Sequence, residues 1–390
     1  MLRIAQWFNN FQTPAVLMID DLSDAYIDVY PQSYKNDWGY LCDSDGSSFD
    51  FLKKELLDNF PQLKITFFVP YLKHNVINEY SRYKYKKFAL GEREEYANFL
   101  VSLVKQGHEI AHHGSNHGKY IDEQIPSTVN NWIHEWALFK DVESGVKVTL
   151  DGVCKFKEVC NIDVVGGKYC GYIAIDNSQD IIDACNFLYW CDKPSYSIAN
   201  YNEGFFGKNN IISFPTNFSG NSFVRLIYLS GDAQRDKKKK IAKYFQPFYN
   251  IYSYIQLYKL YRNRQIISIQ EHNSPSTSAG TVQSANIITD ITSLKKIFAF
   301  LDKLSVWHAT CKEIAEYIYV RENSKIIMNN DELNIFFDNH TKREGMIISI
   351  VQEKEFTIKN ETQVFSSVLN NKSHVINIPV VDGNNYFTIY

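Results

Sequence analysis

Short apolar runs alternate with helix-like stretches over most of the chain. Apolar runs at 15–21 and 64–71 flank a stretch with helical spacing at 49–59. An amphipathic stretch at 92–106 then leads to a third short apolar segment at 110–111, which ends in polar residues. We expect β–α–β units here, because a helix between two buried strands returns the chain so that the strands run parallel.

The same alternation continues toward residue 323. Apolar runs predict strands at 162–167 and 264–272. Helical spacing predicts further helices at 127–141, 150–160 and 178–189, within 230–261, and at 293–304. Strands that alternate with helices indicate the α/β class, and we expect a distorted or incomplete (β/α) barrel.

The pattern changes after residue 323. From 325 to 390, short alternating apolar runs are separated by Asn, Asp and Gly, which is typical of strands joined by turns. The sequence therefore predicts two domains, a (β/α) barrel over 1–323 and a small all-β module over 325–390.

The composition fits a folded protein with a sizeable core, since 45% of the 390 residues are hydrophobic and 22% are charged. A formal net charge of -3 gives no overall positive field for phosphates, so we expect no nucleic-acid partner. Four consecutive lysines at 237–240 are expected to form solvated helix surface, and a patch for an anionic partner is the alternative.

The chain shows no signs of export or membrane insertion. Polar residues interrupt the N-terminal apolar run before it reaches the length of a signal-peptide core. No segment approaches the ~18 uninterrupted apolar residues of a membrane span, so no integral membrane segment is expected. The seven cysteines are odd in number and form no paired CxxC pattern, which favours a reduced, cytoplasmic protein.

Two adjacent aspartates, Asp20 and Asp21, end the first apolar run. Like charges so close together are unfavourable unless a cation or hydrogen bonds compensate them. A metal ion bound by one of them would supply that compensation. Alternatively, the two side chains only cap the strand or the next helix, since aspartate is common in turns.

The segment GHEIAHHGSNH holds four of the ten histidines. His113 and His117 are four residues apart, which places two imidazoles on one side of a helical turn and suits a divalent ion such as zinc. With one aspartate they would form a two-histidine, one-carboxylate site with open positions for water and substrate. The alternative is a polar loop with incidental histidines.

The motifs MIDDL, ITFFVP and GHEIAHHGSNH, in this order, resemble the polysaccharide deacetylase family, also called carbohydrate esterase family four or the NodB-homology family. The resemblance covers most of the predicted barrel. Two positions depart from the family pattern, because Leu22 stands where a glycine is usual and His112 where an asparagine is common. Neither departure removes a predicted ligand.

The resemblance implies a role for each site residue. Asp20 would be the catalytic base, while Asp21, His113 and His117 would hold a divalent metal ion, with zinc the expected one. His272, at the end of the apolar run IISIQEH, would protonate the leaving amine. In the alternative interpretation, His272 only begins the following loop.

The family's third motif is faint in the segment GGKYCGY. By the resemblance, Lys168 would replace the arginine that orients the base, and Tyr169 or Cys170 would give a backbone N–H to the oxyanion. Trp190 would line the acyl pocket or, as an ordinary buried aromatic, belong to the core.

The resemblance implies a hydrolase that removes an N-acetyl or other N-acyl group from an amino sugar, in a glycan or a glycan precursor. The substrate would then be a carbohydrate, and the oligomeric state is left open. The alternative is a catalytically inactive carbohydrate-binding protein on the same scaffold. In a third possibility, the module at 325–390 binds sugar or mediates oligomerisation.

Overall fold

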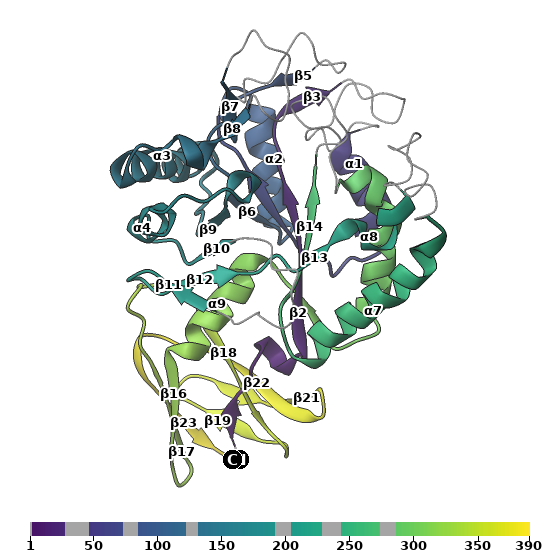
Figure 1. Ribbon diagram of the computed structural model, residues 1–390. Coiled ribbons are helices and arrows are strands. Elements are labelled where there is room, and N and C mark those ends of the chain that lie inside the picture. The colour runs from purple at the N-terminus through teal and green to yellow at the C-terminus, as the bar shows by residue number, and fades with distance from the viewer. Residues whose placement is uncertain are drawn as a thin grey trace.

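The largest sheet of the protein is a curled, mostly parallel one with most of the described helices on its outside (Figure 1). The computed structural model describes residues 2–27, 47–72, 85–121, 132–191, 204–227, 243–273 and 286–390. The strand order is β11-β12-β10-β9-β6-β4-β2-β14-β13, and β15 also pairs with β2. The strands are β2 (Thr13–Asp20), β4 (Ile65–Val69), β6 (Glu109–His112), β9 (Gly166–Lys168), β10 (Tyr189–Cys191), β11 (Gly204–Phe206), β12 (Ile211–Phe214), β13 (Phe218–Ser219), β14 (Ile267–His272) and β15 (Val306–His308).

The direction of these strands defines the fold class. Eight neighbouring strands, from β12 to β13 in the sheet order, run parallel, and β11 is antiparallel at one edge. Within the described residues the edge strands β11 and β13 do not pair with each other. The prediction of an incomplete (β/α) barrel is therefore confirmed.

The helices of the barrel follow its strands in the chain. They are α1 (Ser48–Leu52) with a π-helical turn at Lys53–Leu57, α2 (Glu94–Lys105), α3 (Val142–Cys160), α4 (Ser178–Ala184), α7 (Gln246–Arg262), α8 (Ile287–Leu301) and α9 (Cys311–Glu322). Short 3₁₀ turns lie at Phe8–Asn10, Glu135–Leu138, Cys170–Tyr172, Gly220–Phe223 and Lys243–Phe245. None of the described helices is long and apolar enough to cross a membrane.

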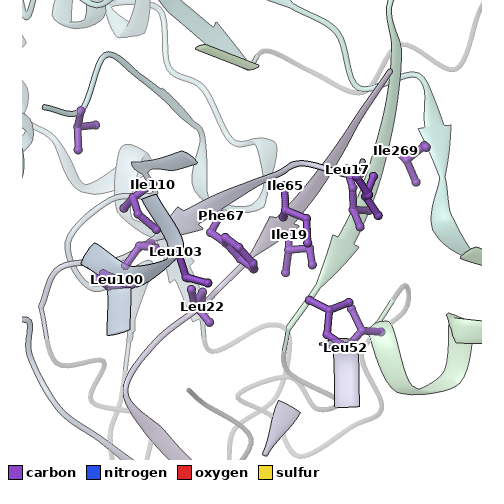
Figure 2. Close-up of a cluster of buried hydrophobic side chains, with 14 of the residues drawn as sticks. Leu17, Ile19, Leu22, Leu52, Ile65, Phe67, Leu100, Leu103, Ile110 and Ile269 are labelled. Atoms are coloured by element: carbon purple, nitrogen blue, oxygen red, sulfur yellow. The ribbon is translucent and has the colours of Figure 1, made fainter. Parts of the chain in front are cut away.

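Alternation along β2 separates two cores. Leu17 and Ile19 point to the outside of the sheet, where Figure 2 shows them with Leu52, Leu100 and neighbouring side chains. Val16 and Met18 instead belong to a second core on the inner side of the sheet. Since side chains alternate with period two, Asp20 falls on that inner side as well.

A group of antiparallel strands follows α9, as the short alternating apolar runs of the sequence predict. These strands are β16 (Ser324–Asn329), β17 (Glu332–Phe337), β18 (Ile347–Gln352), β19 (Thr357–Lys359), β20 (Val364–Ser366), β21 (Val368–Asn370), β22 (Ser373–Pro379) and β23 (Gly383–Ile389). The N-terminal strand β1 (Arg3–Ile4) pairs with β18, and the inner core continues into this region. The all-β character is confirmed, while the division into domains at 323–325 stays a prediction.

One predicted helix is wrong, and another ends earlier than predicted. Of the helix predicted at 127–141, residues 132–134 form β8 (Trp132–His134), which pairs with β7 (Gly118–Tyr120), and residues 122–131 lie outside the described part. The helix predicted at 178–189 ends at Ala184, and the apolar residues that follow lead into buried strand β10. A remaining small ladder joins β3 (Ala25–Ile27) to β5 (Tyr85–Lys87).

Candidate metal and catalytic site

The predicted site residues come together at one edge of the barrel sheet. Asp20 is the last residue of β2, and His272, the last residue of β14, is its partner in register. His113 follows directly on β6. The carboxyl ends of parallel strands meet at the same edge, which is where barrel active sites are built.

The backbone turns sharply at two of these residues. Asp21 has φ 64° and His117 has φ 64°, both in the left-handed region. This conformation is uncommon for residues other than glycine, although aspartate and histidine adopt it more readily than most. Such strained positions cluster at functional sites, where the surrounding structure holds them in place.

Asp21, His113 and His117 form a compact group of potential ligands. Asp21 Oδ1 lies 3.5 Å from His113 Nε2 and 3.6 Å from His117 Nε2. One ligand atom from each residue lies within 4.8 Å of the others. Two imidazoles and a carboxylate are a donor set that divalent transition metals bind, and three protein ligands leave positions open for water and substrate.

The second nitrogen of His113 has a partner that supports this arrangement. His113 Nδ1 lies 3.2 Å from the carbonyl oxygen of Lys168. Because a carbonyl only accepts, Nδ1 donates this hydrogen bond, and in the neutral ring the lone pair of Nε2 is then available to a metal ion. A hydrogen bond of this kind orients the ring of a metal-binding histidine. The residues present therefore fit a divalent metal ion.

A buried carboxylate holds the loop that carries His117. Both oxygens of Glu135 accept from the Ser115 backbone N–H, at 2.8 and 2.9 Å, and one accepts from the Asn116 N–H at 2.8 Å. The ring of His134 lies 5.5 Å from the ring of His117, and burial lowers its pKa. Sequence reasoning missed Glu135, since its role depends on the pairing of β7 with β8.

Asp20 is contacted by two donors. Lys168 Nζ lies 2.9 Å from Asp20 Oδ1, and Gln270 Nε2 donates to Asp20 Oδ2 at 2.9 Å. The ammonium of Lys168 is completely buried, where an unpaired charge would be very unfavourable. The rings of Phe68 and Tyr172 flank it, with centroids 5.1 and 4.8 Å from Nζ.

Gln270 is a residue that sequence reasoning missed. Its Oε1 accepts a hydrogen bond from the hydroxyl of Tyr172, which also lies 3.0 Å from Thr216 Oγ1. Its position two residues before His272 on a strand is the one available signal, because residues two apart share a face. A chain of polar contacts thus runs from Thr216 to Asp20.

His272 lies beside Asp20 and reaches solvent. His272 Nε2 is 4.0 Å from Asp20 Oδ2, and its side chain is 19% exposed. The preceding residue, Glu271, points to the opposite side of the sheet and is fully buried. Burial, and then the nearby Asp290, raises the pKa of Glu271 well above its ordinary value.

The residues of the faint third motif are buried beneath this site. The thiol of Cys170 donates to the backbone carbonyl of His113 at 3.3 Å. Tyr169 packs its ring 4.8 Å from Trp136 and 5.5 Å from Trp190. Trp190 lies on β10 and is completely buried, so it packs as a core residue.

Several solved structures are similar to this chain. Searches of protein-family models and of curated proteins found no match. Similar solved structures include one described as a probable polysaccharide deacetylase from Pseudomonas aeruginosa PAO1, with 14% identity, 80% of this chain and 93% of that chain covered, and a TM-score of 0.43. Another is the peptidoglycan deacetylase PdaC from Bacillus subtilis, with 14% identity, coverage of 78% and 91%, and a TM-score of 0.34.

A third similar structure is a family 4 acetyl xylan esterase from Clostridium thermocellum in complex with a cobalt ion, with 10% identity, coverage of 77% and 90%, and a TM-score of 0.34. Because these identities are low and each TM-score lies below 0.5, the likeness by itself identifies neither a fold nor a reaction. The fold class follows from the strand order, and the chemistry from the residues at the edge of the sheet.

Proposed function

We propose that this protein is a metal-dependent hydrolase that removes an N-acetyl or other N-acyl group from an amino sugar, in a glycan or a glycan precursor. One observation carries the proposal. A carboxylate held by two donors, Asp20, directly precedes Asp21, which lies within 3.6 Å of two histidine nitrogens. A base beside a ligand group of this kind is what hydrolysis of an unactivated amide requires.

Asp21, His113 and His117 would hold the ion. A divalent ion in this position supplies Lewis acidity to the acyl carbonyl and to an attacking water. The buried His113 and the partly exposed Asp21 and His117 leave the ligand group open on the solvent side, where substrate would enter. Zinc is the ion we propose, since the donor set is two imidazoles and one carboxylate.

Asp20 acts as the general base in this proposal. Its carboxylate takes a proton from the water that attacks the amide carbonyl carbon. Lys168 and Gln270 fix the position of the carboxylate during this transfer, because each donates to it at 2.9 Å. Lys168 acts through Asp20 and is a positioning residue.

His272 completes the reaction as the general acid. As the C–N bond breaks, the amine nitrogen takes a proton from His272, and the acyl group leaves as a carboxylate. Nε2 of His272 lies 4.0 Å from Asp20 Oδ2, so the proposed base and the proposed acid lie side by side at the edge of the sheet. The exposed part of the His272 ring gives it access to a bound substrate.

The test is acetate release from N-acetylglucosamine oligomers, with metal content measured on the same samples. The Asp20→Asn variant should keep its metal and lose turnover by at least roughly a hundredfold, because it removes the base. The His117→Ala variant should lose metal and turnover together. His340→Ala, on an exposed turn of the β-rich part, is the matched control and should change neither.

Two results would contradict the proposal. Retained turnover in Asp20→Asn would remove Asp20 from the mechanism. Glycan binding by the metal-loaded wild type without release of any acyl group would favour the inactive carbohydrate-binding protein.

A further inference from the structure

Helix α7 buries one face in the protein. Ser253, Leu257 and Leu260 are at most 1% exposed. On the same side the ring of Tyr254 packs 4.5 Å from Phe223. These contacts account for the attachment of the helix to the barrel.

The opposite face of α7 and of the turn before it is apolar as well. Seven large apolar or aromatic side chains there are between 43% and 70% exposed: Tyr244, Phe245, Phe248, Ile251, Tyr252, Ile255 and Tyr258. The positions 244, 248, 251, 255 and 258 are three or four residues apart and form one stripe along the helix. A helix that is apolar on all sides is ordinarily buried, and Figure 1 shows α7 at the periphery of the molecule. An exposed patch of this size marks an interaction surface.

Basic residues stand at both ends of this stripe. Residues 243–262 contain two lysines and one arginine and no Asp or Glu, although the whole chain has a net charge of -3. Lys243 Nζ lies 5.2 Å from the ring centroid of Tyr244, and the guanidinium of Arg262 lies 5.9 Å from that of Tyr258. The lysines at 237–240 lie outside the described residues.

We propose that the outer face of α7 docks on an anionic phospholipid surface. An interfacial helix lies in the plane of the membrane, with aromatic and aliphatic side chains at the boundary between headgroups and acyl chains. Basic side chains beside such a helix bind anionic headgroups electrostatically. The exposed stripe supplies the first requirement, and Lys243, Lys259 and Arg262 supply the second.

Charge argues against a second copy of the chain as the occupant. Lys243 lies at the start of the helix, while Lys259 and Arg262 lie in its last turn. Whether two copies of α7 paired parallel or antiparallel, cations would meet cations, with no acidic residue on the helix to compensate them. An anionic surface is complementary to both ends.

The test is co-sedimentation of the full-length chain with lipid vesicles. The protein should sediment with vesicles of phosphatidylcholine and phosphatidylglycerol, and much less with phosphatidylcholine alone. Raised salt should weaken the binding, since headgroup attraction is screened. Failure to sediment with the anionic vesicles, or equal sedimentation with both, would overturn the proposal.

Three variants locate the contact. Phe248→Glu should weaken binding to the anionic vesicles by roughly tenfold or more, because one large apolar side chain no longer inserts. Lys259→Glu should also weaken binding to the anionic vesicles, because it replaces a positive charge by a negative one and leaves the apolar stripe intact. Val104→Glu is the matched control, since Val104 is 40% exposed on α2, and it should bind like the wild type.

Two further results would contradict the proposal. Equal binding by Phe248→Glu, Lys259→Glu and the wild type would place the contact elsewhere. A concentration-dependent dimer that Phe248→Glu abolishes, in a protein that does not bind vesicles, would assign the face to a second copy.

Discussion

Asp20 shows how single residues are fixed at this site. Lys168 Nζ lies 2.9 Å from each of its two oxygens, and Gln270, which donates to Oδ2, is itself held by the hydroxyl of Tyr172. The orientation of the carboxylate is therefore set before substrate arrives. Preorganised groups of this kind lower the barrier because little rearrangement remains for the transition state.

The first prediction concerns Gln270. Gln270→Leu keeps a similar volume but removes the donor to Asp20 and the acceptor for Tyr172. We expect kcat to fall by roughly ten- to a hundredfold, as for other residues that orient a functional group, with KM and metal content nearly unchanged. Steady-state kinetics and elemental analysis of the same preparation measure this.

Gln363→Leu, at an exposed position of the β-rich part, is the control and should behave like the wild type. A rise in KM at constant kcat would show that Gln270 contacts the substrate instead. Full activity would remove it from the site.

The second prediction concerns the pH dependence of stability through Glu271. Its pKa in the folded protein lies well above the ordinary value of 4.5, chiefly because of burial. The folded state thus binds this proton more tightly than the unfolded state does. The resulting stabilisation is complete below the unfolded pKa and is lost as the pH rises toward the folded pKa.

Glu271→Gln keeps a neutral side chain at every pH. The free energy of unfolding of this variant, relative to that of the wild type, should therefore be higher at pH 8 than at pH 5. Denaturant unfolding at both pH values measures the difference. An equal difference at the two pH values would show that Glu271 does not titrate with this sign.

At the scale of elements, strongly periodic segments were predictable and paired short segments were not. The helix predicted at 92–106 is α2 at Glu94–Lys105, and the strand predicted at 264–272 is β14 at Ile267–His272. Residues 132–134 were predicted helical, yet they form a strand because they pair with residues 118–120. Local spacing cannot show a partner that lies elsewhere in the chain.

Strand β9 illustrates how an element positions chemistry. It lies between β6 and β10, and it carries Lys168 to Asp20. Its Gly167 is the partner of His112 in register. A side chain on Gly167 would place its Cβ 2.4 Å from a ring carbon of Trp190 and 2.8 Å from the His112 carbonyl oxygen.

The third prediction follows from this close approach. Gly167→Ala should lower the free energy of unfolding by about 1–3 kcal/mol, as overpacking in a core does. It should also reduce turnover, since the next residue is Lys168. Chemical denaturation and the acetate assay measure the two effects, and an unchanged unfolding midpoint would contradict the tight contact.

At the scale of the whole molecule, the site draws on segments far apart in the chain. Asp20 and Asp21, the histidine segment and His272 were predictable because each follows an apolar run and shares a motif with a known family. Gln270, Tyr172 and Glu135 were not, since their roles arise only where separate strands meet. Motifs thus indicated the chemistry, whereas the residues that orient it required the folded chain.

The N-terminal strand gives another example of this limit. β1 pairs with β18, more than three hundred positions away, and Trp7 lies in the inner core that also contains Ile348. A domain boundary predicted from the change in sequence pattern could locate the β-rich module but not the strand β1 that pairs with it. The inner core links the barrel sheet to that module.

The most direct test of the proposed site is the metal content of the purified wild type, prepared without chelator, beside a His113→Ala/His117→Ala variant. We predict about one zinc or similar divalent ion per chain in the wild type, since the three ligands form one site, and almost none in the variant. A wild type without metal even after reconstitution, or a double variant that binds as much as the wild type, would contradict the site on which the proposed function rests.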